Sequence, residues 1–529
     1  MDFYACPIRE GSLSVNLASC LEHQEFQGLL SKARSEPAVE YPRMVCADWL
    51  EARGMAEPAR RWRASMGSPF SRTPLPASFT HPVDLQAPVI WRVAEGFLHA
   101  EAMDMAEWSH AGIWRPWPRV TRDWVDRVQR LASERRIAGL DLSRLLERLA
   151  LPELLAEMPE HAAGHLWLDG NGLLDAQVEM LATCRRLGSL RSLRLGHNRL
   201  TPKAATYLLA APWARNLVSL DLEGNDRFGV QGAQLIGRAY SFGHLKRLHL
   251  AGCGVGDDGL FGIAEAQSQW PMEELDLRSN GITAAGARAL AVSVTASGLV
   301  RLELSGNNLT STATRELLAA LAGGPLARLG LSNCWIGAPV LEALAAGEGP
   351  KALEDLDIGH NGQREGRKWG LGGTHLKALA LAEPMAGLAA LSLANMPWSR
   401  EMAGLFATTP VFRLRRLDLS DCRISPTALP ELLESPWLAD VRSLVLDNNP
   451  IGDRGMAILA NHPALARVQE LSLARCSIGD EGLRLLAAGE TMTDLRHVDL
   501  RGQEFDRDLL TESVDRLGLA GAEYLARAV

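Results

Sequence analysis

One short stretch of the sequence gathers residue types that could do chemistry. In "LVLDNNPIGDRG" (444–455), Asp447, Asn448, Asn449 and Asp453 crowd into one loop that follows a strand-like apolar run. Whether this loop is a site or a structural turn depends on whether its pattern is unique in the chain. Comparison with other positions shows that it is not.

Two further stretches have the spacing of ligand sites. "GCGVGDDG" places Gly254, Gly256 and Gly259 in the G-x-G-x-x-G pattern of a dinucleotide-binding turn. "HAAGH" sets His161 and His165 one helical turn apart, as zinc ligands can be. The glycines recur in "NPIGDRG" and "CSIGDEG", which assigns them to a repeat, and no third metal ligand accompanies the histidines. We therefore expect no cofactor, no metal and no catalytic residue.

The composition indicates a folded protein without a strong charge preference. The chain has 529 residues, a formal net charge of -8 and eight cysteines, none of them in a C-x-x-C pair. No apolar run approaches the ~18 residues that a bilayer span needs, and the N-terminal sequence does not have the pattern of a signal peptide. These features predict a cytoplasmic monomer with neither a membrane nor a nucleic acid as partner.

A repeat of nearly constant period dominates the sequence. Segments such as "LRLGHN", "LDLEGN", "LDLRSN" and "LVLDNN" recur at steps of 26 to 28 residues, with a single step of 35. In each, L-x-L predicts a short strand whose leucines point inward, and the following apolar spacing is helical. One unit cannot bury enough apolar surface to be stable alone, so the units must stack into a solenoid.

The residue that ends each of these segments has a structural explanation. Backbone amides are buried where the chain turns inward, and an Asn side chain can bond the backbone of its own and adjacent coils. A cysteine can occupy the same position as a small buried residue with a weak donor. The predicted structural ladder comprises Asn171, Asn198, Asn225, Cys253, Asn280, Asn307, Cys334, Asn361, Cys422, Asn449 and Cys476.

The units resemble leucine-rich repeats, most closely those of the ribonuclease-inhibitor-like subclass. The pattern "LxLxxN/CxIGxxGxxxL" is nearly spelled by "LSLARCSIGDEGLRLL" (471–486), and the resemblance covers residues 164 to about 505. It implies an α/β solenoid of horseshoe shape, with a parallel sheet on the concave face and helices on the convex face. On this reading Asn449 is a ladder residue and the opening loop is a structural turn.

A different pattern precedes the repeats. In "YPRMVCADWLEARG" (41–54), Pro42 begins a predicted helix and Gly54 ends it. The segment resembles the bacterial repeat-companion domain, whose hallmark is "PRLVYADWLEERGD" and which carries no assigned activity. The matching residues are Pro42, Arg43, Ala47, Asp48, Trp49, Leu50, Glu51, Arg53 and Gly54. A paired-helix motif could also read DNA, but a small helical packing module is the favoured interpretation.

These patterns predict five regions. They are an N-terminal tail (1–21), a helical repeat-companion domain (22–66), a Pro/Trp-rich linker and N-terminal cap (67–135), about thirteen leucine-rich repeats with a degenerate first coil (136–505) and a C-terminal capping helix (506–529). The tryptophans and arginines of 67–135 could stack nucleobases, but a plug that seals the first coil is the favoured reading.

The middle residue of each L-x-L and its flanking positions form the candidate binding face. Because these side chains point away from the leucine core, we expect the charges of this face to be simply solvated. The candidates are Trp167, Arg194, Asp221, Glu223, Asp276, Arg278, Glu303, Asp357, Asp418, Asp447 and Asp499. A second candidate is the insertion that causes the 35-residue step (362–373), with a basic and aromatic tip of Arg364, Arg367, Lys368 and Trp369.

A large recognition surface without a catalytic constellation predicts a non-enzymatic scaffold that binds a protein of mixed or net basic charge on its concave face. The alternative is a regulator of an enzyme, such as a nuclease inhibitor or a GTPase activator, that acts through the same face. A third class, an enzyme with its site in residues 67–135, is the least favoured.

Overall fold

The computed structural model describes residues 89–94, 97–102, 139–141, 143, 151, 155, 164–265, 270–293, 298–362, 371–506, 509 and 513. The predicted tail and companion domain, the tip of the insertion and most of the C-terminal segment lie outside these residues. The chain divides into two compact units, which are described separately. Unit 1 comprises residues 1–200 and 207–221, and unit 2 comprises residues 201–206 and 222–529.

Unit 1 contains a β-hairpin followed by four short parallel strands. Its strands are β1 Val89–Ala94, β2 Phe97–Ala102, β3 Gly139–Asp141, β4 His165–Trp167, β5 Ser192–Arg194 and β6 Ser219–Asp221. Its helices are α8 Asp175–Thr183 and the 3-10 turns η3 Arg185–Leu187 and η4 Ala214–Asn216, and the boundary between the units falls within α9 Pro202–Ala210. Strand β1 pairs antiparallel with β2, which pairs parallel with β3. The hairpin therefore covers the edge of β3, and the sequence did not predict it.

Unit 2 repeats one strand and one helix over its whole described length. Its strands are β7 Arg247–His249, β8 Glu274–Asp276, β9 Arg301–Glu303, β10 Arg328–Gly330, β11 Asp355–Asp357, β12 Ala390–Ser392, β13 Arg416–Asp418, β14 Ser443–Val445, β15 Glu470–Ser472 and β16 His497–Asp499. Its helices are α10 Gly229–Gly237, α11 Gly256–Ala264, α12 Ala284–Ala291, α14 Ser311–Leu321, α15 Ala338–Ala345, α16 Gly373–Ala380, α17 Arg400–Phe406, α18 Leu429–Leu433, α19 Gly452–Leu459 and α20 Asp480–Ala488, with 3-10 turns η5 Tyr240–Phe242, η6 Glu383–Met385, η7 Pro436–Leu438 and η8 Pro463–Leu465.

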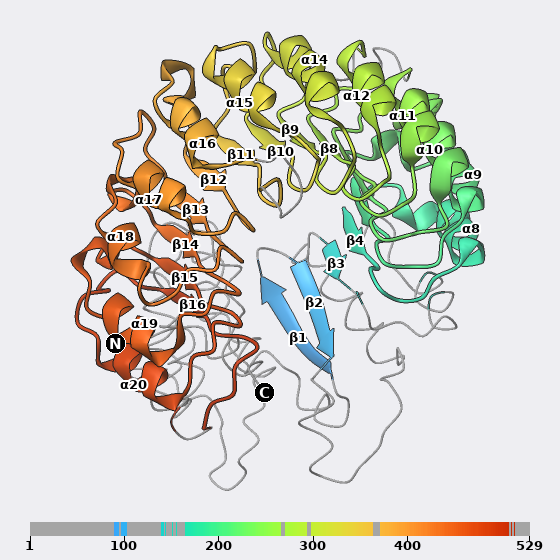
Figure 1. Cartoon of the computed structure of the whole chain (residues 1–529). Coiled ribbons are helices and arrows are strands. Elements are labelled where there is room, and N and C mark those ends of the chain that lie inside the picture. The colour runs from blue at the N-terminus through green and yellow to red at the C-terminus, as the bar shows by residue number, and fades with distance from the viewer. Residues whose placement is uncertain are drawn as a thin grey trace, which may run out of the picture. The chain divides into compact units, whose positions relative to one another are not determined.

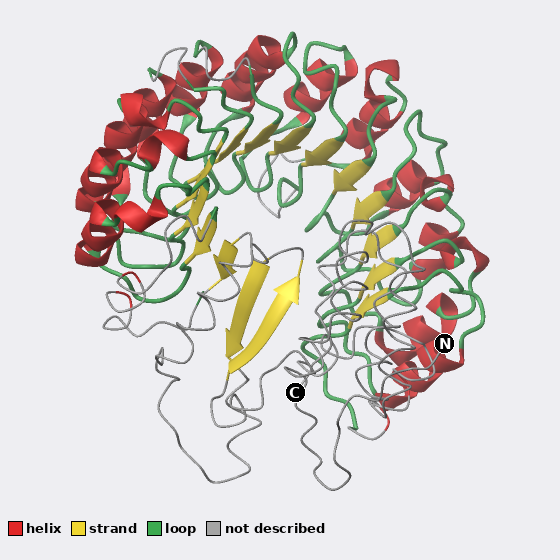
Figure 2. Ribbon diagram, turned by 180° about the vertical axis from the view of Figure 1, so that it is seen from behind, coloured by secondary structure: helices red, strands yellow, loops and turns green. Residues whose placement is uncertain are grey.

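Within unit 2 the strands line the inner side of an arc and the helices line its outer side (Figure 1). All strand pairs from β7 to β16 are parallel and in register, so that each strand leucine lies beside the leucine of the next coil, or beside Val498 at β16. The view from behind shows the same two layers (Figure 2). The predicted solenoid of parallel strands and alternating helices is confirmed.

The core of each coil consists of its two strand leucines and the inner face of its helix. In the coil of β9, Leu302 and Leu304 are fully buried, and Leu317 and Leu321 of α14 are 1% exposed. Each such side chain contributes about 2 kcal/mol when it leaves water. Because neighbouring coils cover each other's leucines, the core runs through unit 2 without interruption.

The ladder asparagines bond the backbone of their own coil and of the preceding coil. The amide nitrogen of Asn307 donates to Leu277 O (2.9 Å) in the preceding coil and to Leu304 O (2.7 Å) in its own. Its oxygen accepts hydrogen bonds from the backbone amides of Asn280 and Ile282, both at 3.0 Å. In unit 1, Asn198 makes the equivalent four bonds. One side chain therefore satisfies four buried backbone groups.

The four ladder cysteines use the same geometry with fewer bonds. Their thiols lie 3.0 to 3.3 Å from a backbone carbonyl oxygen in the preceding coil: Cys253 near Leu222, Cys334 near Leu304, Cys422 near Leu393 and Cys476 near Leu446. Burial raises the pKa of the Cys334, Cys422 and Cys476 thiols to about 12. A thiol with so high a pKa is a poor nucleophile at neutral pH, which agrees with the predicted structural role.

The loop that looked like a chemical site is a turn. Asn449 bonds Leu419 O (2.9 Å) and Leu446 O (2.8 Å), and Gly452 has a φ of 56°, a conformation that favours glycine. The Asp453 carboxylate accepts hydrogen bonds from the amides of Gly479 (2.7 Å) and Gly482 (3.0 Å) at the start of α20 in the next coil. Its polar side chains thus join two coils.

Asp257 repeats this inter-coil contact at α12. Its Oδ1 accepts from the amides of Thr283 (2.8 Å) and Gly286 (3.0 Å), and its Oδ2 accepts from the Thr283 hydroxyl (2.6 Å). A carboxylate at a helix N-terminus is favourable because the first amides have no partner within the helix. In both places a residue of one coil caps the helix of the next.

Among the described residues no helix has both the length and the apolar character that a membrane crossing requires.

Candidate functional site

The residue between the two leucines of each L-x-L, which is the last residue of each strand, forms a row across the sheet, called here the central row. In unit 2 it runs through His249, Asp276, Glu303, Gly330, Asp357, Ser392, Asp418, Val445, Ser472 and Asp499. Adjacent strands of a sheet lie about 4.8 Å apart, so side chains at equivalent positions touch. In unit 1 the row contains Trp167, Arg194 and Asp221.

The expectation that these charges are simply solvated is wrong for much of the row. Asp221 and Asp276 are each 6% exposed and Asp499 is 9% exposed. None of the central-row residues from β4 to β16 reaches the exposure of a free surface side chain. In-register stacking places each side chain against those of its neighbours, and several carboxylates accept arginine or backbone hydrogen bonds as well.

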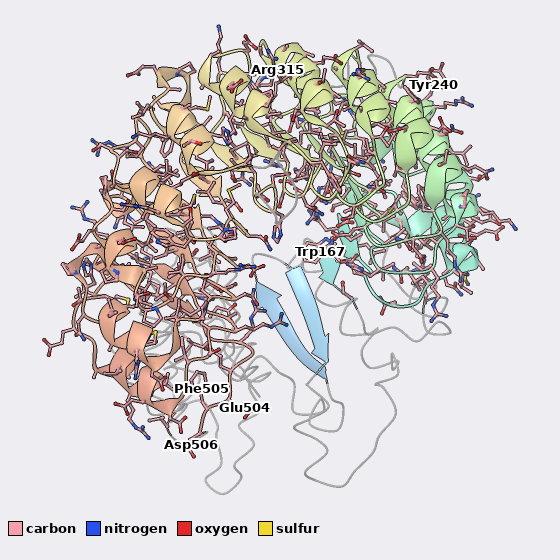
Figure 3. The ribbon with its side chains drawn as sticks, viewed as in Figure 1. Trp167, Tyr240, Arg315, Glu504, Phe505 and Asp506 are labelled. Carbon is pink, nitrogen blue, oxygen red and sulfur yellow. The ribbon has the colours of Figure 1, made fainter. Side chains whose placement is uncertain are left out.

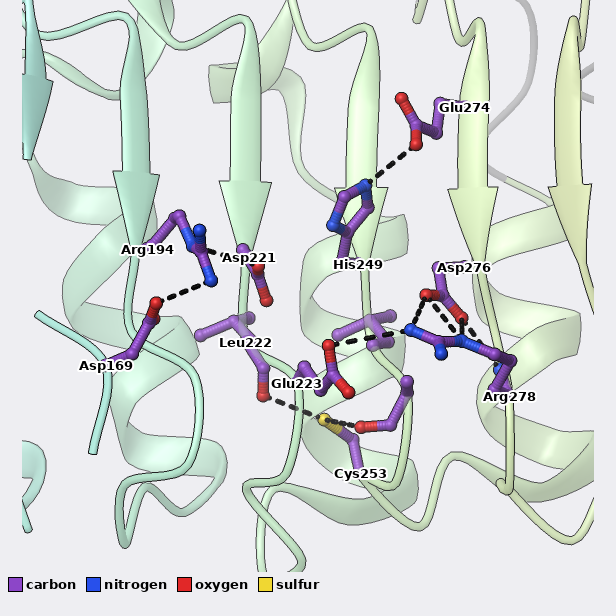
Figure 4. A network of polar contacts seen from close by, with 12 residues as sticks. Asp169, Arg194, Asp221, Leu222, Glu223, His249, Cys253, Glu274, Asp276 and Arg278 are labelled. Carbon is purple, nitrogen blue, oxygen red and sulfur yellow. Dashed lines mark hydrogen bonds and ion pairs between the residues drawn. The ribbon is translucent and has the colours of Figure 1, made fainter. Parts of the chain in front are cut away.

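In unit 1 one arginine balances two carboxylates. Arg194 Nη2 lies 2.7 Å from Asp169 Oδ2, and its Nε lies 3.4 Å from Asp221 Oδ2 (Figure 4). The guanidinium also lies 5.0 Å from the centroid of the Trp167 ring, a cation–π distance. Trp167, labelled in Figure 3, projects from β4. Arg194 therefore joins three strands through two ion pairs and one aromatic contact.

The first strands of unit 2 are also ion-paired. Arg278 Nη2 lies 2.6 Å from Asp276 Oδ2 and 3.6 Å from Glu223 Oε2 (Figure 4). His249 Nε2 lies 3.3 Å from Glu274, which also pairs with Arg301.

The charge of Glu274 is strongly favoured by these partners. The hydrogen bond with His249, together with Arg301, lowers the pKa of Glu274 to about 2, although burial alone would raise it. At this end of unit 2, carboxylates and bases are matched.

The balance changes further along unit 2. We call Asp276, Glu303, Asp357 and Asp418 the acidic row; they occupy central positions between β8 and β13. Burial, together with the charges of Asp276 and Asp357, raises the pKa of Glu303 to about 7. Burial and the charge of Asp418 raise the pKa of Asp357, against hydrogen bonds from Gly359 and Ser392. Glu303 and Asp357 therefore lie beside like charges that their own partners do not fully offset.

Other acids near the row share this property. Burial raises the pKa of Asp355, which has an ion pair with Arg328 at 3.7 Å, and that of Asp447, which accepts hydrogen bonds from the Ser472 hydroxyl (2.6 Å) and the Ala474 amide (2.9 Å). At the last described strand, Asp499 again has an arginine partner, Arg501. The uncompensated charge is thus concentrated on the middle strands of unit 2.

Gly330 is the one member of the acidic stretch without a side chain, and Glu303 uses the space. A Cβ atom at position 330 would overlap Oε2 of Glu303. The Glu303 carboxylate therefore lies over β10, between its own strand and that of Asp357. The glycine in "LGLSNC" was visible in the sequence, but only the register shows which carboxylate it admits.

The structure brings together most candidates, but not all can be placed. Glu223, Asp276 and Arg278 form one cluster in unit 2, while Glu303, Asp357 and Asp418 follow one another along its central row. The basic insertion tip, Arg364, Arg367, Lys368 and Trp369, lies outside the described residues.

Comparison with known proteins adds to this geometry. Models of the leucine-rich repeat family match residues 214–237, 244–264, 271–291, 413–435 and 468–487. In unit 2 these segments coincide with strand-and-helix coils. These segments are leucine-rich repeats. No curated protein matches it.

Solved structures with a similar chain path are distant relatives at most. A chain from the yeast complex of Rad7 and Elc1 is 15% identical, with 77% of this chain and 92% of that one covered and a TM-score of 0.43. An internalin from Listeria monocytogenes is 16% identical over 73% and 98% of the two chains, with a TM-score of 0.32. A chain from the complex of TLR13 with ssRNA13 is 18% identical over 72% and 42%, with a TM-score of 0.30.

Proposed function

We propose that this leucine-rich-repeat protein is a non-enzymatic scaffold that binds another protein through the strand face of unit 2. The observation that carries the proposal is the acidic row. Within it, Glu303 and Asp357 are fixed on stacked strands beside like charges, and no ion pair of theirs is found among the described residues, whereas Glu274 and Asp276 of β8 are paired with bases. A partner with a net basic surface would supply the missing charge.

Rigidity supports the same proposal. Each strand is held by in-register pairing and by a buried ladder residue, so the face loses little conformational freedom when a partner binds. Steering by a fixed row of like charge also speeds association with an oppositely charged protein. The row supplies charge and orientation, and the partner's own surface must supply complementarity of shape.

We further propose the finer identity that the sequence suggests. The repeats are of the ribonuclease-inhibitor-like type, the segment 22–66 is a bacterial repeat-companion domain, and the protein works as a monomer in the cytoplasm. The short I-G-x-x-G turns and the alternation of Asn and Cys in the ladder support the repeat type. The basic insertion tip is a second contact region for the same partner.

Affinity capture from the native cell tests the proposed function. The bait is the full chain, compared with a double charge reversal on the face, Asp357→Lys with Asp418→Lys. The matched control reverses two exposed acids on the helical side of unit 2, Glu342→Lys with Glu434→Lys, so both variants have the same net charge.

We expect the control to retain the partner and the face variant to lose it by at least tenfold, measured by quantitative mass spectrometry. Equal capture by both variants would remove the face from consideration. If the captured partner is an enzyme, its turnover with and without the chain distinguishes a regulator from a scaffold.

A further inference from the structure

The position of Glu303 is the starting point of a more specific inference. Its carboxylate occupies the space over β10 that a side chain at Gly330 would fill, and it lies in register between Asp276 on β8 and Asp357 on β11. Among the described residues, none is found to form a hydrogen bond or an ion pair with the side-chain carboxylate of Glu303; the nearby arginines pair with other acids. It is the member of the acidic row whose charge has the least compensation.

The charged groups on every neighbouring strand explain this state. Asp276, Asp357 and Asp355 oppose the ionisation of Glu303, and Arg278 favours it. Arg278, however, is bonded to Asp276.

The other two nearby arginines are also engaged. Arg301, on the same strand as Glu303, pairs with Glu274, and Arg328 on β10 pairs with Asp355. Each nearby base thus already serves another carboxylate.

We propose that Glu303, seated over Gly330, is the docking point for one lysine or arginine side chain of the protein partner, and that docking is coupled to the release of a proton. The inference rests on the proposed function and specifies the chemistry of its central contact. An ammonium or guanidinium pairs with a single carboxylate, whereas a divalent cation needs six or more oxygen ligands. The single central carboxylate over the glycine gap fits the first requirement.

The coupling to protons follows from linkage. Without a partner, Glu303 has a pKa of about 7 and is partly protonated at neutral pH. A bound cation favours the carboxylate form and lowers that pKa, so binding strengthens as the pH rises through 7. Below pH 7 the affinity falls by up to about tenfold per pH unit, until the pKa of the complex is reached.

Isothermal titration calorimetry of the full chain tests the proposal. The probe is a synthetic 12-residue peptide of alternating lysine and serine, and its control has glutamine in place of lysine. Titrations at pH 6.0, 7.0 and 8.0, each in two buffers of different ionisation enthalpy, give the affinity and the number of protons released. We expect the lysine peptide to bind at least fivefold more tightly at pH 8.0 than at pH 6.0, with release of about half a proton at pH 7.0.

Two variants of the site and one control define the outcome. Glu303→Gln removes the ionisable group, and Gly330→Ala keeps every charge but displaces the flexible end of Glu303. Both should abolish the pH dependence, and Glu303→Gln should weaken binding at pH 8.0 at least threefold. Glu342→Gln, an exposed acid of α15, should behave like the wild type. Circular dichroism melting confirms that each variant is folded.

The opposite results overturn the proposal. They are absent binding at pH 8.0, pH dependence that survives in Glu303→Gln, equal binding of the glutamine peptide, or calcium chloride alone binding at Glu303 with the same proton release. These failures differ from failure of the proposed function. If the captured partner depends on the acidic row but binds Glu303→Gln normally, the scaffold stands and only the Glu303 contact is wrong.

Discussion

The strand faces of the two units share one scaffold but treat charge differently. In unit 1 a single arginine, Arg194, neutralises Asp169 and Asp221 and covers Trp167. In the middle of unit 2, Glu303 and Asp357 follow one another with only a glycine between them. The same repeat therefore produces a surface whose charges are compensated by neighbouring side chains in one place and a surface with uncompensated charge in the other.

The difference shows where the information for binding lies. The leucines and ladder residues recur in both units and specify the coil, so they say nothing about a partner. The residues between the leucines are free to vary, and their charge balance distinguishes one part of the face from another. A face whose charges neutralise one another gains little electrostatic energy when a partner binds. An acidic row gains more from a basic partner.

The largest effect should come from the feature that both units share. Asn198→Ala in unit 1 and Asn307→Ala in unit 2 each remove four hydrogen bonds to buried backbone groups, at a cost of about 4 kcal/mol of unfolding free energy. Urea denaturation measures the loss, and Asn461→Ala, an exposed amide, should cost less than about 0.5 kcal/mol. A clear difference between the two ladder variants would mean that the scaffolds are not equivalent.

A smaller loss of unfolding free energy should follow from Arg194→Ala, which tests whether the carboxylates of unit 1 depend on this arginine for charge compensation. Asp169 and Asp221, whose side chains are 11% and 9% exposed, would lose their arginine. We expect a cost of about 2–3 kcal/mol, because charges that are nearly buried are left without their counter-ion. The matched change in unit 2, Arg328→Ala, removes an exposed pair at 3.7 Å and should cost less than about 0.5 kcal/mol. Similar losses for both would contradict the comparison.

The smallest effect has the opposite sign. The folded-state pKa of Glu303 is about 7, above its ordinary value of 4.5, so the folded chain loses stability as the pH rises from about 4.5 to about 7 and has lost all of this contribution above 7. Glu303→Gln removes this cost, and we expect it to stabilise the chain by about 1–2 kcal/mol at pH 8. At pH 5, where Glu303 is mostly protonated, the gain should nearly vanish.

Urea denaturation at the two pH values measures this change, with Glu342→Gln as the control. A variant that is less stable than the wild type at pH 8 would show that Glu303 is satisfied after all.

Much of the fold follows from the sequence because each coil is specified locally. Asn307 and Cys334 occupy the same step of a fixed period, and their burial and bonds could be inferred from the period alone. The hairpin of β1 and β2 could not be inferred from the sequence, because its residues do not follow the repeat pattern. Only its pairing with β3 in the structure reveals it.

The site was less predictable for a related reason. The position of Glu303 was known, but its environment depends on side chains from β8, β10 and β11, which are about 27 or more residues apart in sequence. Local spacing identifies the face of a strand on which a residue lies. It does not show that Arg278 folds back on Asp276 or that a glycine admits the carboxylate of Glu303.

The carboxylates of Asp257 and Asp453 have an evolutionary consequence. Each belongs to one coil but completes the first turn of the helix in the following coil. Recombination that duplicates or deletes whole periods would separate these caps from the helices they serve unless the junction falls between compatible neighbours. We therefore expect the insertion or deletion of whole coils to be tolerated best where each cap stays beside a helix that it can serve.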